Sequence, residues 1–418
     1  MANHDVIVIG GGLAGLAAAR TLAAAGVAPL LLEASAEVGG RVATDEVDGF
    51  LLDRGFQVLL DSYPEARQQL DLAALQLGRF APGALIRREG GFGRVADHWR
   101  APVAGVRSLF SGAFTPIDAL RMLKLRSNAI LALEGDPIAR GDETAARGLH
   151  RRGFSDRAIE RFFRPFFGGV FLDTQLGAPV HWFEFLFGMF AIGHATLPSG
   201  GMGAIPRQLA AGLPEGSLRV DARVRSLKGT RVELASGELL DADAVILATD
   251  ARNAPVLLPG SRAPQWSSCV TLYYAAAASP IAEPLLMLNG EDRRGPVNHV
   301  CVPSDVNASY APPGQSLISA TVVGSGHADD AILDRDARAQ LSGWFGADAL
   351  RGWRLLRVAR VPYALPRAVP APDSVAAAVR LGPQLYGCGD YLETPSINGA
   401  LRSGRRAAEA LLADRRAR

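Results

Sequence analysis

Three glycines near the start of the chain, Gly10, Gly12 and Gly15, have the spacing of a phosphate-binding turn. The first glycine allows a tight turn, the second lets the backbone approach a pyrophosphate, and the third lets a helix pack closely on a strand. Glu33 stands 23 residues after Gly10, where a carboxylate can accept hydrogen bonds from ribose hydroxyls and repel a 2′-phosphate. This pattern predicts that the chain binds a dinucleotide.

The elements around the glycines agree with that prediction. A β-branched run, Val6–Ile9, precedes them, an Ala/Leu-rich stretch follows, and a second apolar run ends at Glu33. This order indicates a strand, a helix and a second strand. Free amides at the start of the helix would then face the phosphates.

A second glycine-rich segment follows at Gly39, Gly40 and Arg41. Its flexible backbone and single guanidinium suit another contact with the same pyrophosphate. FAD and NAD share the first fingerprint, so the glycines alone do not choose between them.

The choice between FAD and NAD rests on motifs at both ends of the chain, which resemble those of a known superfamily. The glycine turn, Glu33, the segment 39–41, DGFLLDRGFQV at 48–58 and YGCGDYLETPSINGALRSGRRAAEAL at 386–411 resemble the superfamily of flavin-dependent amine oxidases, phytoene desaturases and protoporphyrinogen oxidases. The pattern is nearest to the phytoene-dehydrogenase-like branch. The resemblance implies FAD. The only cysteine of the C-terminal segment, Cys388, precedes Gly389 at the end of an expected strand, so the cofactor is predicted to be non-covalent.

The resemblance also assigns cofactor contacts. The ADP half of FAD would lie on Gly10, Gly12, Leu13, Ala14, Gly15, Glu33 and Ala34, with Gly40 and Arg41 beside the pyrophosphate. The isoalloxazine ring would lie over Gly55, Phe56 and Gln57, and adenine would contact the backbone of Val224. Gly389 and Asp390 would meet the phosphates and ribityl chain.

A helix near the C-terminus is predicted to face the ring. Ser396 is a suitable N-cap, and the amides of Ile397 and Asn398 could stabilise negative charge on a reduced flavin.

The same resemblance predicts an α/β fold, α+β overall, with a Rossmann-like FAD domain of the glutathione-reductase type and an inserted substrate domain of mixed sheet and helix. The FAD domain would comprise 1–60, 197–255 and 380–418, and the substrate domain 61–196 and 256–379. Residues 217–250 alternate like two or three strands, with turns at Lys228–Gly229 and Ser236–Gly237.

Phenylalanine indicates where a substrate could bind, because ten of the 17 lie between Phe154 and Phe190. Such density forms either a helical core or the wall of an apolar tunnel. In the tunnel hypothesis the wall is formed by some of Phe166, Phe167, Phe171, Phe185 and Phe187. His181 and Glu184, one helical turn apart, are either proton carriers there or ordinary polar residues.

The chemistry expected is dehydrogenation of an apolar molecule, isoprenoid or tetrapyrrole-like, by hydride transfer to flavin N5. Amine oxidases of the superfamily commonly use a lysine near N5, but the chain has only Lys124 and Lys228, and neither fits that role. No catalytic residue can be named. Two alternatives stay open: a flavin amine oxidase, and a non-catalytic prenyl-protein chaperone on the same fold.

The remaining features limit partners and location. A net charge of +2 gives no reason to expect nucleic-acid binding, and the three cysteines suggest reduced core thiols rather than a metal site. Gly324 and Gly326 lack the third glycine of an NAD turn, so the electron acceptor is expected to be oxygen, a quinone or another organic oxidant. The opening strand has no leader ahead of it, which favours the cytoplasm, and the basic segment 98–131, with a helix start at Thr115, could rest on a membrane surface. The oligomeric state is not predicted.

Overall fold

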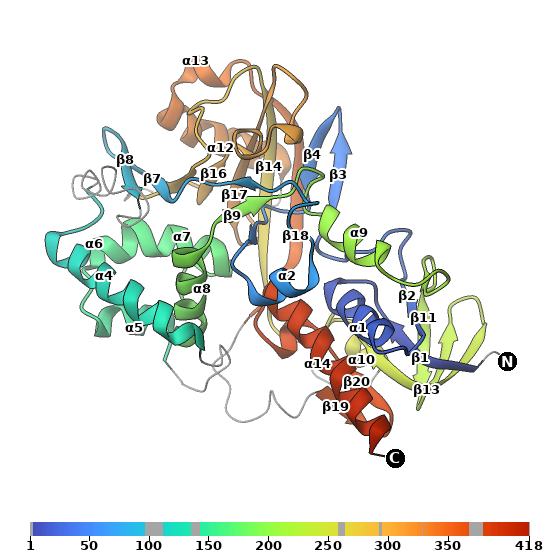
Figure 1. The fold of residues 1–418 in the computed structure, drawn as a ribbon. Helices are drawn as coiled ribbons and strands as arrows, with labels where there is room; N and C mark the ends of the chain where they lie inside the picture. Colours follow the sequence, from blue (N-terminus) through green and yellow to red (C-terminus); the bar gives the residue numbers. More distant parts are fainter. Residues whose placement is uncertain are drawn as a thin grey trace.

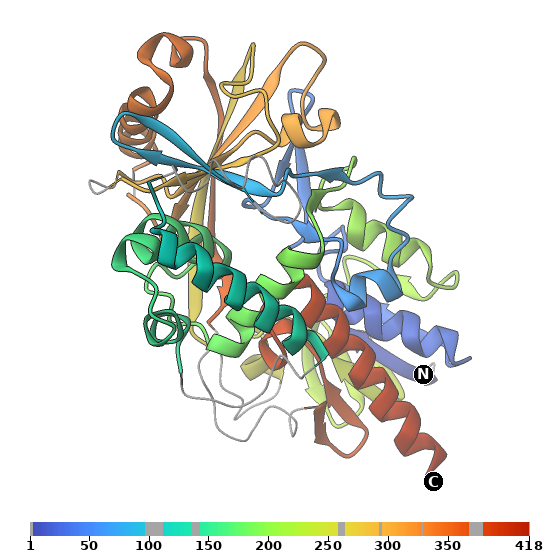
Figure 2. The same ribbon diagram turned by 60° about the vertical axis from the view of Figure 1, so that its left-hand side comes forward.

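The computed structural model describes residues 3–96, 112–134, 143–257, 264–291, 295–327, 329–367 and 379–417. Two large sheets and a group of helices make up the molecule (Figure 1). One sheet lies near both chain ends and the other lies at the far end of the molecule, with the helices of residues 116–192 beside it (Figure 2). The architecture is mixed α/β, as predicted.

The first sheet holds the predicted nucleotide-binding turn. Within the described residues it has eight strands, in the order β10-β2-β1-β13-β12-β11, with β20 paired to β13 and β19 to β20. Strands β1, β2, β10, β13 and β20 are parallel, whereas β11, β12 and β13 form an antiparallel meander. The bounds are β1 Asn3–Ile9, β2 Pro29–Leu32, β10 Leu218–Arg219, β11 Val224–Lys228, β12 Arg231–Leu234, β13 Leu239–Leu247, β19 Arg380–Gly382 and β20 Leu385–Gly387.

Helices α1 (Leu13–Ala24) and α14 (Ile397–Arg416) pack together on one face of this sheet. Val6 and Val8 of β1 point toward them, whereas Ile7 and Ile9 point into a smaller core on the other face. A strand buried on both faces needs a continuous apolar run, which explains why residues 6–9 are all Val or Ile.

The second sheet has seven strands among the described residues, in the order β18-β14-β17-β16-β15-β7-β8, and all neighbours except β15 and β7 are antiparallel. Its even-numbered residues on β14 and β17, such as Leu272 and Ala320, pack against α12 and α13. The odd-numbered residues face the other way, toward α7 and the first sheet. The bounds are β7 Gly83–Arg88, β8 Gly91–Ala96, β14 Trp266–Ala276, β15 Leu286–Asn289, β16 His299–Cys301, β17 Ser316–Val323, β18 Arg354–Pro366, α12 Asp330–Phe345 and α13 Ala347–Leu350.

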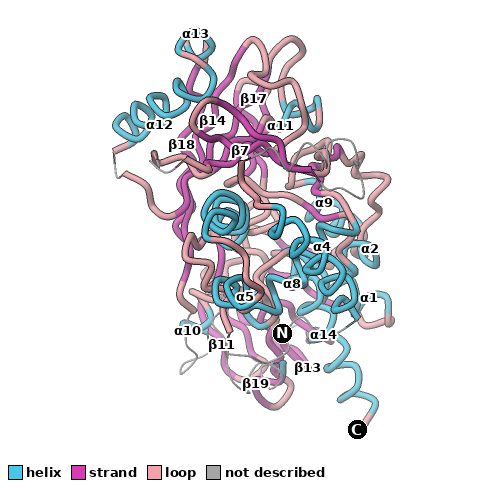
Figure 3. Tube along the Cα trace, turned by 90° about the vertical axis from the view of Figure 1, so that its left-hand side faces the viewer, coloured by secondary structure: helices cyan, strands magenta, loops and turns pink. Residues whose placement is uncertain are grey.

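The helices of residues 116–192 form a layer beside the second sheet (Figure 3). They are α4 Pro116–Leu131, α5 Ala145–Arg151, α6 Asp156–Ala158, α7 Arg164–Phe171 and α8 Val180–Ile192, with a π-helical turn at Ile159–Phe163. Smaller elements connect the parts: β3 Thr44–Val47, β4 Phe50–Asp53, β5 Leu59–Leu60, α2 Pro64–Gln69, β6 Gly78–Arg79, β9 Ala195–Leu197, α9 Ala204–Ala211, α10 Ala254–Leu257 and α11 Pro303–Val306.

Several local predictions are confirmed. The strand, helix and strand at the start of the chain are β1, α1 and β2, and the meander turns at the two predicted glycine positions. Thr115 caps α4 in a reciprocal arrangement with Asp118, and Ser396 caps α14. Strands of the first sheet fall within 3–32, 218–247 and 380–387, and those of the second within 83–96 and 266–366. The domain boundaries themselves stay a prediction.

The packing of α14 on α1 predicts the effect of a single methyl group. A Cβ built on Gly404 would lie 2.0 Å from Ala14 O, whereas one on Gly343 of α12 would meet nothing within 4 Å. Gly404→Ala should therefore lower the free energy of unfolding by about 2–3 kcal/mol, and the control Gly343→Ala should raise it by about 0.5–1 kcal/mol. Urea denaturation of both variants measures these changes. Equal effects of the two substitutions would contradict the packing argument.

Candidate active site

A cavity of about 810 Å³ lies where the parallel strands of the first sheet end. Gly10 follows β1, Glu33 follows β2, Ala248 follows β13 and Gly389 lies two residues after β20, and all four line the cavity. Ligands of parallel α/β sheets bind at this edge because the strand order reverses there and opens a crevice. The cavity reaches the second sheet at Cys269 and His299.

The glycine turn leaves room for a ligand. Gly12 lines the cavity, and a Cβ built on it would meet no chain atom within 4 Å. Gly10 has a φ of +111°, which favours glycine, and its Cβ would lie 2.7 Å from Ala248 O. Gly15 does not line the cavity; a Cβ there would lie 1.9 Å from Gly10 O, so this position admits no side chain.

Glu33 is anchored at the end of β2. Its Oε2 accepts a hydrogen bond of 2.7 Å from Gly11 N, and its Oε1 accepts one of 2.8 Å from Ser35 N. Leu13, Ala14 and Ala34 line the cavity around it. Val224 also lines this part, because Ala222 N, two residues earlier, donates to Glu33 O.

Arg41 and Asp390 join the two ends of the chain. Gly39 N donates to Gly11 O over 2.8 Å, which sets the loop of Gly40 and Arg41 against the glycine turn. The Arg41 guanidinium then meets Asp390 Oδ1 at 2.5 Å, and both residues line the cavity. Burial lowers the pKa of Arg41, but the attraction of Asp390 outweighs it, so the pKa is raised and the guanidinium stays charged.

The segment after β4 crosses the cavity. Gly55 has a φ of +85° and Gln57 Nε2 donates to Arg41 O over 3.0 Å, so the segment is held against the Arg41 loop. Gly55, Phe56 and Gln57 all line the cavity. The Phe56 ring lies 5.3 Å from the ring of His299.

Asp53, the last residue of β4, anchors the start of this segment. It is buried, and its carboxylate accepts hydrogen bonds of 2.9 Å from Met202 N and from Tyr310 Oη, while Tyr273 Oη donates to its carbonyl over 2.8 Å. Burial raises the pKa of Asp53 to about 6, although the hydrogen bonds that its carboxylate accepts from Thr44, Met202 and Tyr310 oppose the shift.

The start of α14 closes the cavity at the other end. Ser396 Oγ accepts from Gly399 N, and the first helical bond runs from Ala400 N to Ser396 O, so the amides of Ile397 and Asn398 lie ahead of the helical ladder. Ile397 lines the cavity. Asn398 does not, because its side chain turns toward α2 and its Oδ1 accepts from Glu65 N over 3.1 Å.

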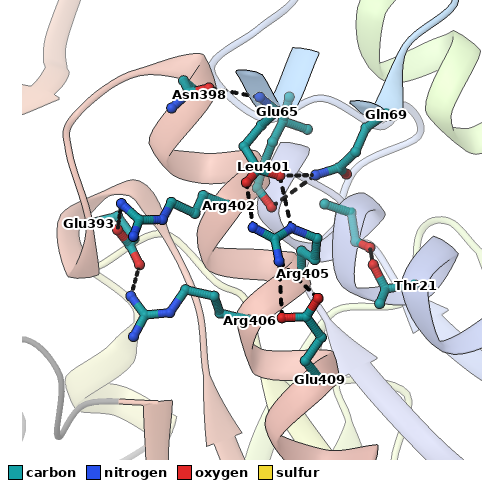
Figure 4. Close-up of polar contacts among 11 residues, drawn as sticks. Thr21, Glu65, Gln69, Glu393, Asn398, Leu401, Arg402, Arg405, Arg406 and Glu409 are labelled. Atoms are coloured by element: carbon teal, nitrogen blue, oxygen red, sulfur yellow. Dashed lines mark hydrogen bonds and ion pairs between the residues drawn. The ribbon is translucent and has the colours of Figure 1, made fainter. Parts of the chain in front are cut away.

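A network of ion pairs holds this end of α14 (Figure 4). Arg405 binds the buried Glu65 of α2 at 2.6 Å and also Glu409. Arg402 and Arg406 flank Glu393, which precedes the helix. The network fixes where Ile397 meets the cavity.

A second cavity of about 240 Å³ continues the first toward α4. Phe56, Val58, Phe166, Val170, Phe190 and Leu286 line both cavities. Of the five predicted tunnel residues, Phe166, Phe167 and Phe187 line it. Phe171 and Phe185 line neither cavity and belong to the helical core instead: Phe171 packs on Trp182, and Phe185 lies two residues from Phe187 and so on another side of α8.

His181 and Glu184 line neither cavity. Glu184 pairs with Arg152, so the proton-carrier alternative is not supported. Lys124 and Lys228 line neither cavity as well.

The segment with Gly324 and Gly326 leads into α12, where Asp329 accepts from the amides of Ala331 and Ile332. A carboxylate therefore occupies the place that a pyrophosphate would need. No metal-ligand cluster exists in the part of the chain that the structure describes.

The sequence interpretation missed His299 and Cys269. Both are buried and line the first cavity. A histidine within the apolar stretch of residues 297–302 is a signal that could have been noticed, whereas Cys269 looks like any small core residue.

The basic segment is described only from residue 112 onward, so Arg100 and Arg107 lie outside the described residues. The outer face of α4 carries the exposed Ile117, Leu120, Leu123 and Leu131. No described helix is long and apolar enough to cross a membrane.

The chain is similar to known proteins in sequence and in fold. Residues 13–412 match the family described as flavin containing amine oxidoreductase. Coproporphyrinogen III oxidase of Propionibacterium freudenreichii is 30% identical over 176 residues, 41% of this chain and 32% of that protein. Putrescine oxidase of Kocuria rosea is 43% identical over 74 residues, 18% of this chain and 16% of that one, and carotenoid 3,4-desaturase of Haloarcula japonica is 49% identical over 55 residues, 13% and 11%. The aligned part is thus a third or less of these relatives' length.

Solved structures agree over the whole chain. Putrescine oxidase bound to putrescine has a TM-score of 0.73 at 16% identity and covers 99% of both chains. A protoporphyrinogen oxidase-like protein from Exiguobacterium has a TM-score of 0.72 at 17% identity, covering 99% of this chain and 100% of that one. At these identities the likeness establishes the fold.

The buried Asp53 predicts a pH dependence of stability. Because its pKa rises from 3.8 in the unfolded chain to about 6 in the folded one, the folded state binds the proton more tightly. Stability should fall as pH rises from about 4 to about 6, by roughly 3 kcal/mol for this group. Asp53→Asn should remove that slope, and the exposed Asp156→Asn should keep it. Urea denaturation across this range measures it; parallel curves for wild type and Asp53→Asn would contradict the assignment.

Proposed function

The chain belongs to the family of flavin-containing amine oxidoreductases, and we propose that it is an FAD-dependent oxidoreductase that dehydrogenates an apolar molecule of isoprenoid or tetrapyrrole type. The observation that carries this proposal is the phenylalanine-lined second cavity, which opens into the first. Such a wall binds mainly by removing apolar surface from water, at about 25 cal/mol per Å². A small charged amine would lose its hydration there, and no Asp or Glu among the described residues lines the second cavity to pair with it.

The residues of the first cavity fit FAD. Glu33 offers carboxylate oxygens to a ribose, Gly12 and Gly40 leave space for a pyrophosphate, and Arg41 supplies a positive charge that Asp390 holds in place. When bound, FAD supplies a ring nitrogen that accepts a hydride from a substrate carbon. Phe56, Gln57 and Ile397 would orient the ring, and the surrounding apolar side chains would exclude water. We propose that this nucleotide-binding part is of the glutathione-reductase type.

The cofactor is proposed to be non-covalent. Of the three cysteines, all within the described residues, Cys269 alone lines one of these two cavities, and burial raises the pKa of its thiol to about 11, so the thiol stays protonated. Cys388 is fully buried and lines neither cavity.

A flavin amine oxidase is the second candidate, favoured by the local identity to putrescine oxidase. The absence of a lysine from both cavities weighs against it. The match to an oxidoreductase family and the similarity to oxidases favour an enzyme over the non-catalytic prenyl-protein chaperone.

Reoxidation is proposed to use oxygen, a quinone or another organic oxidant, because Asp329 fills the anion site of the second glycine segment. The three buried free thiols suit a reducing compartment such as the cytoplasm. Contact of the α4 face with a membrane stays a prediction.

Gly12→Val tests the cofactor site. The branched side chain would enter the space next to the turn, so flavin content after purification should fall at least tenfold, whereas the exposed control Gly343→Val should keep it. Flavin is released by acid precipitation and measured by absorbance. Unchanged occupancy in Gly12→Val would refute the role of the turn, and a chromophore that stays with the precipitated wild-type protein would refute non-covalent binding.

Ala119→Phe tests the substrate class, because Ala119 of α4 lines the second cavity and Ser127 of the same helix is exposed. Anaerobic flavin bleaching is followed with isoprenoids, porphyrinogens, polyamines and aromatic amines. For isoprenoids or porphyrinogens, Ala119→Phe should lower kcat/KM about tenfold with flavin content unchanged, and Ser127→Phe should leave both unchanged. Bleaching by a simple primary amine, with no response to the apolar compounds, would favour the amine oxidase instead.

A further inference from the structure

Trp266, the first residue of β14, contacts an arginine of the first cavity without lining that cavity itself. Arg41 Cζ lies 5.4 Å from the centre of the Trp266 ring, within the distance of about 6 Å over which a cation and an aromatic ring attract each other. Arg41 lines the first cavity, whereas Trp266 lines neither cavity. Trp266 can therefore influence a ligand there through Arg41 rather than by direct contact.

The second sheet holds the Arg41 side chain at two points. One is the Trp266 ring on β14, and the other is Ala364 O on β18, which accepts a hydrogen bond from Arg41 Nη1 over 3.2 Å. Arg41 Nη2 donates to Asp390, in the C-terminal part of the chain. The two hydrogen bonds use the edge of the planar guanidinium, and the ring adds an attraction that needs no hydrogen bond. The arginine proposed to lie beside the pyrophosphate thus depends on the second sheet for its position.

A second arginine of the first cavity lies near the same indole. Arg252 Cζ is 5.9 Å from the centre of the Trp266 ring and 4.1 Å from the centre of the Tyr363 ring, and its guanidinium pairs with Asp250 at 2.9 Å. Trp266 and Tyr363 meet edge to face, with 5.9 Å between the ring centres. Arg252 and Asp250 also line the first cavity. Two positive charges of the cavity wall therefore lie near one aromatic ring that attracts both.

The indole leaves a polar group unpaired, which a phenylalanine would not do. Trp266 Nε1 is buried and has no hydrogen-bond partner among the described residues. A buried donor without a partner costs free energy. Tryptophan, however, attracts a cation more strongly than tyrosine or phenylalanine does. The residue type at this position therefore suits contact with the two arginines.

We infer that Trp266 is a positioning residue for FAD: its ring holds the Arg41 guanidinium beside the first cavity, so that the second sheet takes part in retaining the cofactor. This inference rests on the proposed cofactor site and adds to it a residue that does not line the cavity. Without the indole, Arg41 would keep its charge and its bond to Asp390, but its guanidinium would lose a contact that opposes movement. FAD should then bind more weakly.

Trp266→Leu, made in the wild type and in Arg41→Met, tests this route. The FAD dissociation constant is measured by ultrafiltration of the FAD-loaded protein at a series of dilutions, which separates free from bound flavin. Trp266→Leu should raise the constant about three- to tenfold in the wild type and less than about twofold in Arg41→Met. The control Trp353→Leu, in the core on the other face of the second sheet, should leave it unchanged. Equal effects of Trp266→Leu in both backgrounds would overturn the inference, because the indole would then act through packing alone.

Fluorinated tryptophan provides a measurement that does not depend on the folding of a leucine variant. Fluorine withdraws electrons from the indole and weakens its attraction for a cation with little change of shape. In the wild type, the FAD dissociation constant should rise stepwise from tryptophan to monofluoro- and difluorotryptophan, and in Trp266→Phe it should stay the same across the series. A constant that is unchanged in the wild type, or the same rise in both proteins, would overturn the inference. The flavin content of the purified wild type, measured first, tests the cofactor site separately from Trp266.

Discussion

The close approach of α14 to α1 and of α1 to β1 is the constraint on which the site depends. Gly15 and Gly404 stand where a Cβ would come within 1.9 Å of Gly10 O and 2.0 Å of Ala14 O. Two layers of backbone can therefore lie in direct contact, with dispersion between them and no side chain separating them. Because α14 packs this closely on α1, the segment that precedes α14 lies at the edge of the sheet where β1 ends. The two ends of the chain form one cavity for this reason.

Ion pairs then set the details of that junction. Arg41 pairs with Asp390 and Arg405 pairs with Glu65, so both pairs connect the C-terminal part of the chain to the N-terminal part. Arg402 and Arg406 pair with Glu393 and connect α14 to the loop before it. Partly buried pairs of this kind add little net stability, since desolvation offsets much of the attraction. Their planar geometry gives orientation instead. The start of α14, where Ile397 lines the first cavity, thus has a defined position.

The two cavities differ in the chemical character of their walls. The first has glycine backbone, Glu33, Arg41 and Asp390 at the end proposed for the phosphates, and the second is walled by phenylalanine. The second sheet places His299 against the first cavity beside Phe56, which lines both cavities, and burial lowers the pKa of its ring to about 4. This arrangement suits the proposed dehydrogenation better than recognition of a cationic amine.

The sequence by itself determined the features that depend on neighbours within a few residues. The turn at Gly10, the strands and helix around it, and the caps at Thr115 and Ser396 follow from local backbone preferences and short hydrogen bonds. The tertiary structure alone decided which side chains reach the cavities. Phe187 lines one and Phe185 does not, Asn398 turns to Glu65, and His299 meets the carbonyl of Pro165 through Asn298. Helical and strand spacing divides a segment into faces, but contacts across more than a hundred residues of sequence determine what each face meets.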